Sequence, residues 1–382
     1  MSVFLRRRPF STSTLSHFDW THGPSVWRYP YTDIKPEQLP QKNVSLVFFP
    51  SCSLLSTKEE WRESAELLSN VGYKCILIDW PGWHTRNTPI NWAIEEDSKC
   101  GRLVSTMTDF AYATLQHIKS TASVKEEMHV VVAGGSSAVH IKRALLEMSS
   151  PDTSLTCFAP SWRFYLTRFV SEGYPRKLSR RRSIADWFLD RLFVRSRMMF
   201  KMYRSKVSLA KLTRRLYENK LQHNSALLDQ KRNIIMRDRP LSIDAAMISG
   251  YCDPITSTSE FIDELIGAAS SVHEEGNDDS DDDDGLLNIK APTWVMSTPD
   301  EKSVSSDVQE HTKNLIPIHL VFPQDVVTAD RKEMDTVRIW ADHAQSSNVS
   351  ISEIAGKLFS HEEHPALAAS IIQDYVSRFP HI

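Results

Sequence analysis

The sequence lacks any run of 18 or more apolar residues, so no membrane-spanning helix is expected. Its five cysteines show no paired spacing, which argues against a disulfide framework or a zinc site and is typical of reduced thiols in a reducing compartment. No nucleotide- or metal-binding motif is present, so no cofactor or metal is expected. The 382 residues are enough for one large domain with an elaboration, or for two small domains.

Acidic residues are also absent before Asp19, where the arginines 6–8 stand among several serines and threonines. This composition is typical of an organellar transit peptide, and the step before Ser11 resembles a mitochondrial processing site. We therefore expect residues 1–18 to be a transit peptide or disordered segment. The expected location is an organellar matrix, mitochondrial rather than plastid.

Charge is distributed unevenly along the chain. Residues 161–240 carry 21 lysines and arginines against 6 acidic residues, a surplus of 15 positive charges. Such a segment can bind an anionic membrane surface, or its basic side chains can simply face solvent on a helical cap. No nucleic-acid partner is expected. Residues 273–285 are the reverse, an acidic tract that predicts a disordered surface loop without the spacing of a calcium site.

Elsewhere, short β-branched runs alternate with segments of helical periodicity. Strands are predicted at Val44–Phe49, Lys74–Ile78, the run before Gly134, Leu155–Ala159, Ala246–Gly250, Thr293–Ser297 and Ile318–Phe322. Helices are predicted at Lys58–Asn70, Thr106–Lys119, Val139–Met148, Ile184–Tyr203, Ser208–Leu221 and Pro365–Phe379. The alternation predicts an α/β fold with a mostly parallel sheet flanked by helices. The core would comprise residues 40–160 and 241–380, with a helical cap at 161–240 between them.

The most informative motif is the run that ends in Gly134-Gly135-Ser136-Ser137-Ala138 and leads directly into a helix. A nucleophile elbow needs small residues two positions before and two positions after the nucleophile. Gly134 and Ala138 meet that need if Ser136 is the centre, whereas a centre at Ser137 would put Val139 at a small-residue position. A phosphate-binding turn or a plain strand-to-helix loop are the alternatives.

The order of motifs resembles the α/β-hydrolase fold superfamily. The motifs are Val44–Pro50, the turn Asp79–Trp83, the elbow, the strand end Phe158–Trp162 and the tail Gly356–Pro365. More narrowly, Ser249–Ser257 and Lys332–Met334 are similar to an uncharacterised plant and cyanobacterial branch. The resemblance implies an α/β-hydrolase core with an inserted cap. In that branch it also implies a catalytic triad that is degenerate.

The resemblance implies a catalytic order of serine, acid and histidine. Ser136 is the candidate nucleophile, with Asp300 or Asp325 as the acid and Asp253 as a third choice. Typical members carry their histidine where this chain has Leu358, so His361, and less favourably His364, are the candidate bases. The candidate oxyanion donors are the amides of Ser51, Cys52 and Ser137.

Pocket-lining or structural roles are also predicted for several aromatic and histidine residues. Trp80, Trp83 and Trp162 are candidate lining residues of an apolar pocket, while His84 and His140 are interpreted as structural. The expected function is a serine hydrolase acting on an apolar acyl ester. The alternative is a catalytically degenerate hydrolase-fold protein that binds a small apolar ligand, or a protein or membrane partner, without turnover.

Overall fold

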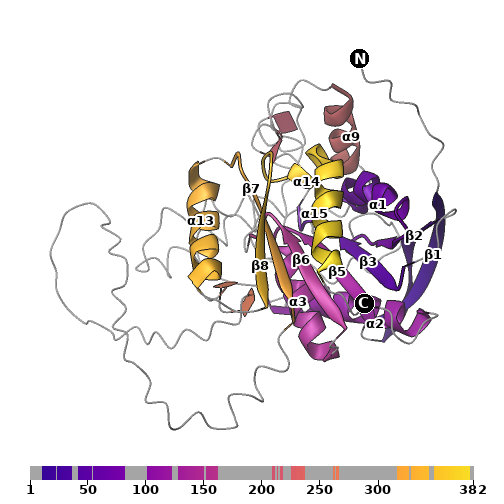
Figure 1. Ribbon diagram of the computed structural model, residues 1–382. Helices are drawn as coiled ribbons and strands as arrows, with labels where there is room; N and C mark the ends of the chain where they lie inside the picture. The colour runs from indigo at the N-terminus through magenta and orange to yellow at the C-terminus, as the bar shows by residue number, and fades with distance from the viewer. Residues whose placement is uncertain are drawn as a thin grey trace, which may run out of the picture.

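The structure is a computed structural model, and it describes residues 11–22, 24–36, 42–53, 55–81, 101–122, 128–149, 152–161, 209–210, 213, 216–217, 225–236, 261–262, 264–265, 316–326, 328–343 and 348–378. They form an eight-stranded sheet with helices on both faces (Figure 1). No helix among these residues is long and apolar enough to cross a membrane.

The strands lie in the order β1-β2-β4-β3-β5-β6-β7-β8. Their bounds are β1 Ser11–His22, β2 Ser25–Pro36, β3 Val44–Phe49, β4 Lys74–Leu77, β5 Met128–Gly134, β6 Thr153–Phe158, β7 Ile318–Pro323 and β8 Val349–Ile354. β1 and β2 are antiparallel to each other, and β2 is antiparallel to β4. The other strands are parallel, as the predicted strand–helix alternation requires.

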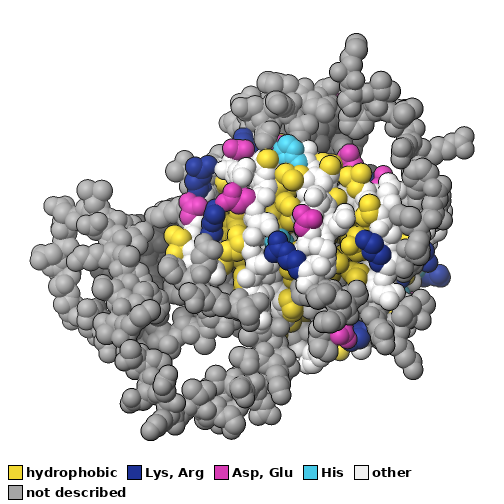
Figure 2. Space-filling view, viewed as in Figure 1, with side chains coloured by type: hydrophobic (Ala, Val, Ile, Leu, Met, Phe, Trp, Pro, Cys, Tyr) yellow, Lys and Arg dark blue, Asp and Glu magenta, His cyan; other side chains and the backbone are white. Residues whose placement is uncertain are grey.

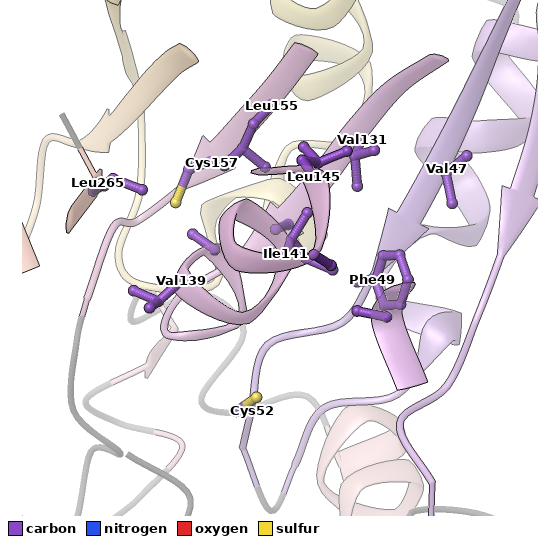
Figure 3. Close-up of a cluster of buried hydrophobic side chains, with 14 of the residues drawn as sticks. Val47, Phe49, Cys52, Val131, Val139, Ile141, Leu145, Leu155, Cys157 and Leu265 are labelled. Atoms are coloured by element: carbon purple, nitrogen blue, oxygen red, sulfur yellow. The ribbon is translucent and has the colours of Figure 1, made fainter. Parts of the chain in front are cut away.

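Side chains of the central strands alternate between the two faces. Val131 and Ala133 belong to the same buried cluster as residues of α2 (Gly101–Thr121), α3 (Ser137–Met148) and α13 (Thr328–His343). Figure 3 shows part of this cluster, with Val131 labelled. Val130 and Val132 face α1 (Arg62–Ser69) and α15 (Pro365–Ser377). Because both faces are covered, the strands read as continuous apolar runs, which is why the sequence predicts them.

The predictions for five parallel strands and for the helices at 58–70, 106–119, 139–148 and 365–379 are confirmed, with shifted ends. Residues 11–18 are not disordered, so that part of the expectation for residues 1–18 does not hold for them, while the transit peptide stays a prediction. Ser11–His22 form β1, and Phe18 and Trp20 are buried against Phe110 of α2. The strands β2 and β8 were not predicted either.

Several predictions lie outside the described residues. They are the strands at 246–250 and 293–297, the helix at 184–203, the acidic loop at 273–285 and most of the basic cap. From the cap, the structure describes residues 209–217 in part and α9 (Ser225–Met236). On the face seen in Figure 2, acidic and basic side chains of the described residues are interspersed rather than separated by sign.

Candidate functional site

The turn between β5 and α3 has the form of an elbow, but its strained residue is not the one predicted. Gly135 has φ +55°, in the left-handed region, whereas Ser136 has φ −71° and ψ −9°, already in right-handed helical conformation. Positive φ is the strained backbone conformation of such a turn. The centre of the elbow is therefore Gly135, one residue before the predicted position.

Close packing explains why a second glycine precedes it. A Cβ on Gly134 would lie 2.2 Å from Ser51 Oγ and 3.2 Å from the Ser51 amide nitrogen. A Cβ on Gly135 would lie 3.6 Å from Ser51 Cβ, an ordinary contact. Gly134 is thus required by the close approach of the β3 loop, and Gly135 by its backbone conformation.

The two serines after the glycines have different surroundings. Ser136 is the N-cap of α3 and is 4% exposed, and its hydroxyl forms no capping hydrogen bond. Ser137 is fully buried, and its hydroxyl donates to the Pro50 carbonyl at 2.6 Å and accepts from Trp80 Nε1 at 3.2 Å. Among the described residues, no hydrogen bond joins Ser136 to a histidine.

The loop after β3 supplies the other predicted oxyanion residues. The Ser51 amide donates to Glu60 Oε1 at 2.9 Å, so it is not available to hold a substrate oxygen, contrary to the prediction. Cys52 is buried, with its Sγ 3.3 Å from Ser137 Oγ. The structure places all three predicted oxyanion residues beside the elbow, but the Ser51 amide is already hydrogen-bonded to Glu60.

His361, the predicted base, is in the protein core. It lies on α14 (Ser360–Glu363), is fully buried, and stacks on Trp61 with ring centroids 4.0 Å apart. Its Nε2 lies 3.3 Å from Glu60 Oε1, and Glu60 is itself buried. Sequence reasoning missed Glu60, because nothing in the sequence links residues separated by 301 positions. His364, the second choice, is half-buried at the N-cap of α15.

The predicted acid Asp325 follows β7 and is exposed. Its amide donates to the Gly356 carbonyl at 2.9 Å, which joins the loop after β7 to the loop after β8. Leu358 lies in that second loop, half-buried against the core. Asp300 and Asp253 lie outside the described residues.

Trp80 does not line a pocket. Its side chain is fully buried, and its indole Nε1 donates to the Pro50 carbonyl at 2.8 Å. The Tyr29 hydroxyl donates to the Trp80 carbonyl at 2.8 Å. Trp80 therefore holds the strand ends together as part of the core, and the prediction for it is wrong. Trp83, Trp162 and His84 lie outside the described residues, while His140 is fully buried beside Thr108, in keeping with a structural role.

Comparison with known proteins bears on this geometry. No protein-family model and no curated protein matches the chain. Among solved structures, it is similar to an esterase from Thermogutta terrifontis, with a TM-score of 0.54, 11% identity and coverage of 96% of this chain and 98% of the esterase. It is also similar to a probable hydrolytic enzyme from Pseudomonas aeruginosa, with a TM-score of 0.54, 9% identity and coverage of 94% and 93%. A thioesterase domain from the curacin biosynthetic pathway gives 0.52, 10% identity and coverage of 94% and 99%. The chain has the α/β-hydrolase fold.

The α/β-hydrolase fold defines where catalytic groups would lie. The nucleophile occupies the centre of the elbow, and the oxyanion donors are the amide of the next residue and an amide of the loop after β3. In this chain the elbow centre is Gly135, so the next amide belongs to Ser136 rather than to the predicted Ser137. By the resemblance of the tail, the histidine position holds Leu358. Of the candidate acids, only Asp325 lies among the described residues, in the loop after β7.

A buried charged cluster, which the sequence did not indicate, joins the described part of the cap to this edge of the sheet. Lys231 of α9 is 1% exposed and lies 2.7 Å from Glu362 Oε1. Its Nζ also donates to the Leu55 carbonyl at 3.3 Å. The Tyr217 hydroxyl donates to Glu362 Oε2 at 2.6 Å, and burial followed by the Glu362 charge raises the pKa of Tyr217 well above its ordinary value. The cluster ties α9, α14 and the β3 loop to one another.

Proposed function

We propose that this α/β-hydrolase-fold protein binds a small apolar ligand without hydrolysing it. The observation that carries the proposal is the glycine at the centre of the elbow. Gly135 takes the strained conformation that positions a nucleophile, and it has no side chain to supply one.

The position of the base supports the same conclusion. Serine hydrolysis needs a histidine within hydrogen-bond reach of the nucleophile and a carboxylate to orient that histidine. Leu358 has no proton-accepting atom, and it lies where the resemblance puts the catalytic histidine. His361 is packed flat against Trp61 beside Glu60 in the core, and no described residue links it to Ser136.

The arrangement around the elbow supports binding. In open α/β sheets, ligands bind beyond the carboxyl ends of the parallel strands. Here the loop after β3, the residue preceding α14 and part of the cap meet in one buried apolar cluster. In it, Leu216 and Tyr217 of the cap lie with Leu55 and Phe359. An edge with an apolar cluster beside it suits a small ligand that is mostly apolar.

Labelling with a fluorophosphonate probe tests the absence of hydrolytic chemistry. We expect the purified protein to gain no probe adduct by intact mass, while a known serine esterase in the same tube is labelled fully. The Ser136→Ala variant should behave like the parent protein. A stoichiometric adduct on the parent that is lost in Ser136→Ala would overturn the proposal and support a serine hydrolase. An adduct mapped to Ser51 would overturn it equally.

A further inference from the structure

The outer edge of β1 has no partner among the described strands. β1 (Ser11–His22) is the last strand at one end of the sheet, at the right in Figure 1, and pairs there with β2 alone. Its 12 residues pair one to one with those of β2, so no bulge interrupts it. In such a strand, every second residue directs its backbone N–H and C=O groups away from the sheet. β1 therefore presents a long, regular row of hydrogen-bonding groups at the sheet edge.

The sequence of β1 lacks the features that usually prevent edge-to-edge pairing of sheets. Proteins protect edge strands with proline, with lysine, with bulges or by keeping the strand short. β1 contains no proline, lysine, arginine or glycine, and Asp19 is its one acidic residue. It is also twice as long as the six-residue strands β3, β6, β7 and β8. The strand is thus suited to pair with another strand.

One face of the hairpin of β1 and β2 carries exposed apolar side chains. Leu15 and Val26 are 64% and 65% exposed, the highest values among the large hydrophobic side chains of the described residues. Val26 pairs with Thr21, and Leu15 shares a face of β1 with Thr21 because the two are six residues apart. The other face carries Phe18, which is buried against Phe110 of α2. A strand added to β1 would cover exposed apolar surface and leave the packing on α2 intact.

Symmetry limits how a second copy of β1 can pair with the first. Two identical antiparallel strands are related by a twofold axis, and opposite residues share a face of the sheet, so one residue must lie opposite its own copy. If that residue is Asp19, two carboxylates face each other, and if it is His17, each Asp19 faces the partner's Leu15. Only with Phe18 at the axis does each Asp19 lie opposite the partner's His17. Since like charges opposite each other are unfavourable and an acid beside an imidazole is favourable, the charges select Phe18.

The register centred on Phe18 also matches the apolar surface. It pairs residues 14–22 of one copy with the same residues of the other. Each Leu15 then lies opposite the partner's Thr21, which is paired on its other side with the partner's Val26. The exposed apolar side chains of the two copies are thus drawn together on one face of the joined sheet. This match is a property of two copies of the same hairpin.

We propose that β1 is the interface of a homodimer, in which two copies pair antiparallel about Phe18 and their eight-stranded sheets join into one. The occupant of the edge is a second copy of this chain, because the charged and apolar residues of the strand complement themselves. The dimer is separate from the proposed ligand site and does not depend on the proposed function.

Sedimentation equilibrium of the full-length protein over a range of concentrations tests the dimer. We expect a monomer–dimer equilibrium with a dissociation constant in the micromolar range, in which the dimer has twice the 43.7 kDa mass of the chain. His17→Asp should weaken the dimer about tenfold, because it puts a second carboxylate opposite Asp19 at two places in each dimer. The exchange His17→Asp, Asp19→His should restore it. Ile339→Asp, which adds the same charge at an exposed position of α13, should have no effect.

Cysteine cross-linking tests the register. Leu15 and Thr21 are exposed, and in one chain they lie about 20 Å apart along the strand, too far for a disulfide. The double variant Leu15→Cys, Thr21→Cys should therefore form a covalent dimer on mild oxidation, seen on a non-reducing gel. Each single variant and the parent should stay uncross-linked. Circular dichroism checks that every variant is folded.

Three results would overturn the proposal. A chain that is monomeric at every concentration, including one that binds an extended peptide instead, has no such dimer. A dimer that His17→Asp does not weaken and that the double cysteine variant does not cross-link has its interface elsewhere. Cross-linking of Leu15→Cys alone would place the axis at Leu15 and refute the register centred on Phe18.

Discussion

Replacing Lys231 by methionine should destabilise the protein far more than the loss of a surface ion pair. Lys231 is 1% exposed, and the Glu362 side chain is 15% exposed. Removing one partner of a buried pair leaves the other charge desolvated and costs about 3–5 kcal/mol. The Tyr217 hydroxyl would still donate to Glu362, so we expect the lower end, about 3 kcal/mol, in the free energy of unfolding.

The chain provides a matched control in the ion pair between Arg338 and Glu353, whose side chains are 45% and 38% exposed. Arg338→Met should cost less than about 1 kcal/mol. The double variant Lys231→Met, Glu362→Gln should lose no more than Lys231→Met alone, because the unpaired buried carboxylate is then gone.

Urea denaturation at pH 7, followed by circular dichroism, measures these differences, and native-state hydrogen exchange of the α9 amides localises them. A Lys231→Met variant within about 1 kcal/mol of Arg338→Met would refute the reasoning. So would additive losses in the double variant.

Three further predictions concern other parts of the fold. Burial, followed by the charge of Arg378, lowers the pKa of His319 to about 4, so the folded state holds the neutral ring and the unfolded state takes up the proton first. Stability should therefore fall as the pH drops from about 6.5 to about 4, by up to roughly 3 kcal/mol from this group, and His319→Gln should flatten that part of the profile measured by denaturation. A chain that starts at Ser25 should be at least about 3 kcal/mol less stable than one that starts at Ser11, because it loses the buried Phe18 and Trp20, and equal melting curves would contradict the packing of β1. Gly134→Ala should cost about 1–3 kcal/mol through the clash with Ser51, and the added change Ser51→Gly should restore part of the loss; a neutral Gly134→Ala would contradict the close approach.

The central sheet could be predicted from the sequence because its parallel strands are buried on both faces. Runs such as 44–49 and 318–322 are almost wholly apolar, and helical segments separate them. The edge hairpin could not be predicted in the same way. In β1, residues 11–14 are all serine or threonine and only Leu15, Phe18 and Trp20 are apolar, while the preceding arginines gave the segment the composition of a targeting peptide. Within β1, only the two buried residues Phe18 and Trp20 show the two-residue spacing that is typical of a strand with one buried face.

The sequence predicted where the elbow lies, but it placed the centre of the elbow one residue too late. The requirement for small residues two positions on either side selects Ser136, yet it does not say which residue takes positive φ. Two adjacent glycines meet two separate demands, close contact with Ser51 at Gly134 and backbone strain at Gly135. The pairing of Glu60 with His361 depends on α14 lying beside the loop after β3, a tertiary contact that no local pattern encodes.

The central claim is that the elbow carries no working nucleophile, and turnover of p-nitrophenyl butyrate tests it most directly. The purified protein and its Ser136→Ala variant should release p-nitrophenol at the same rate, no faster than a heat-denatured sample at equal concentration. Saturable turnover by the parent that Ser136→Ala abolishes, with both proteins equally folded, would contradict the claim and assign Ser136 as the nucleophile.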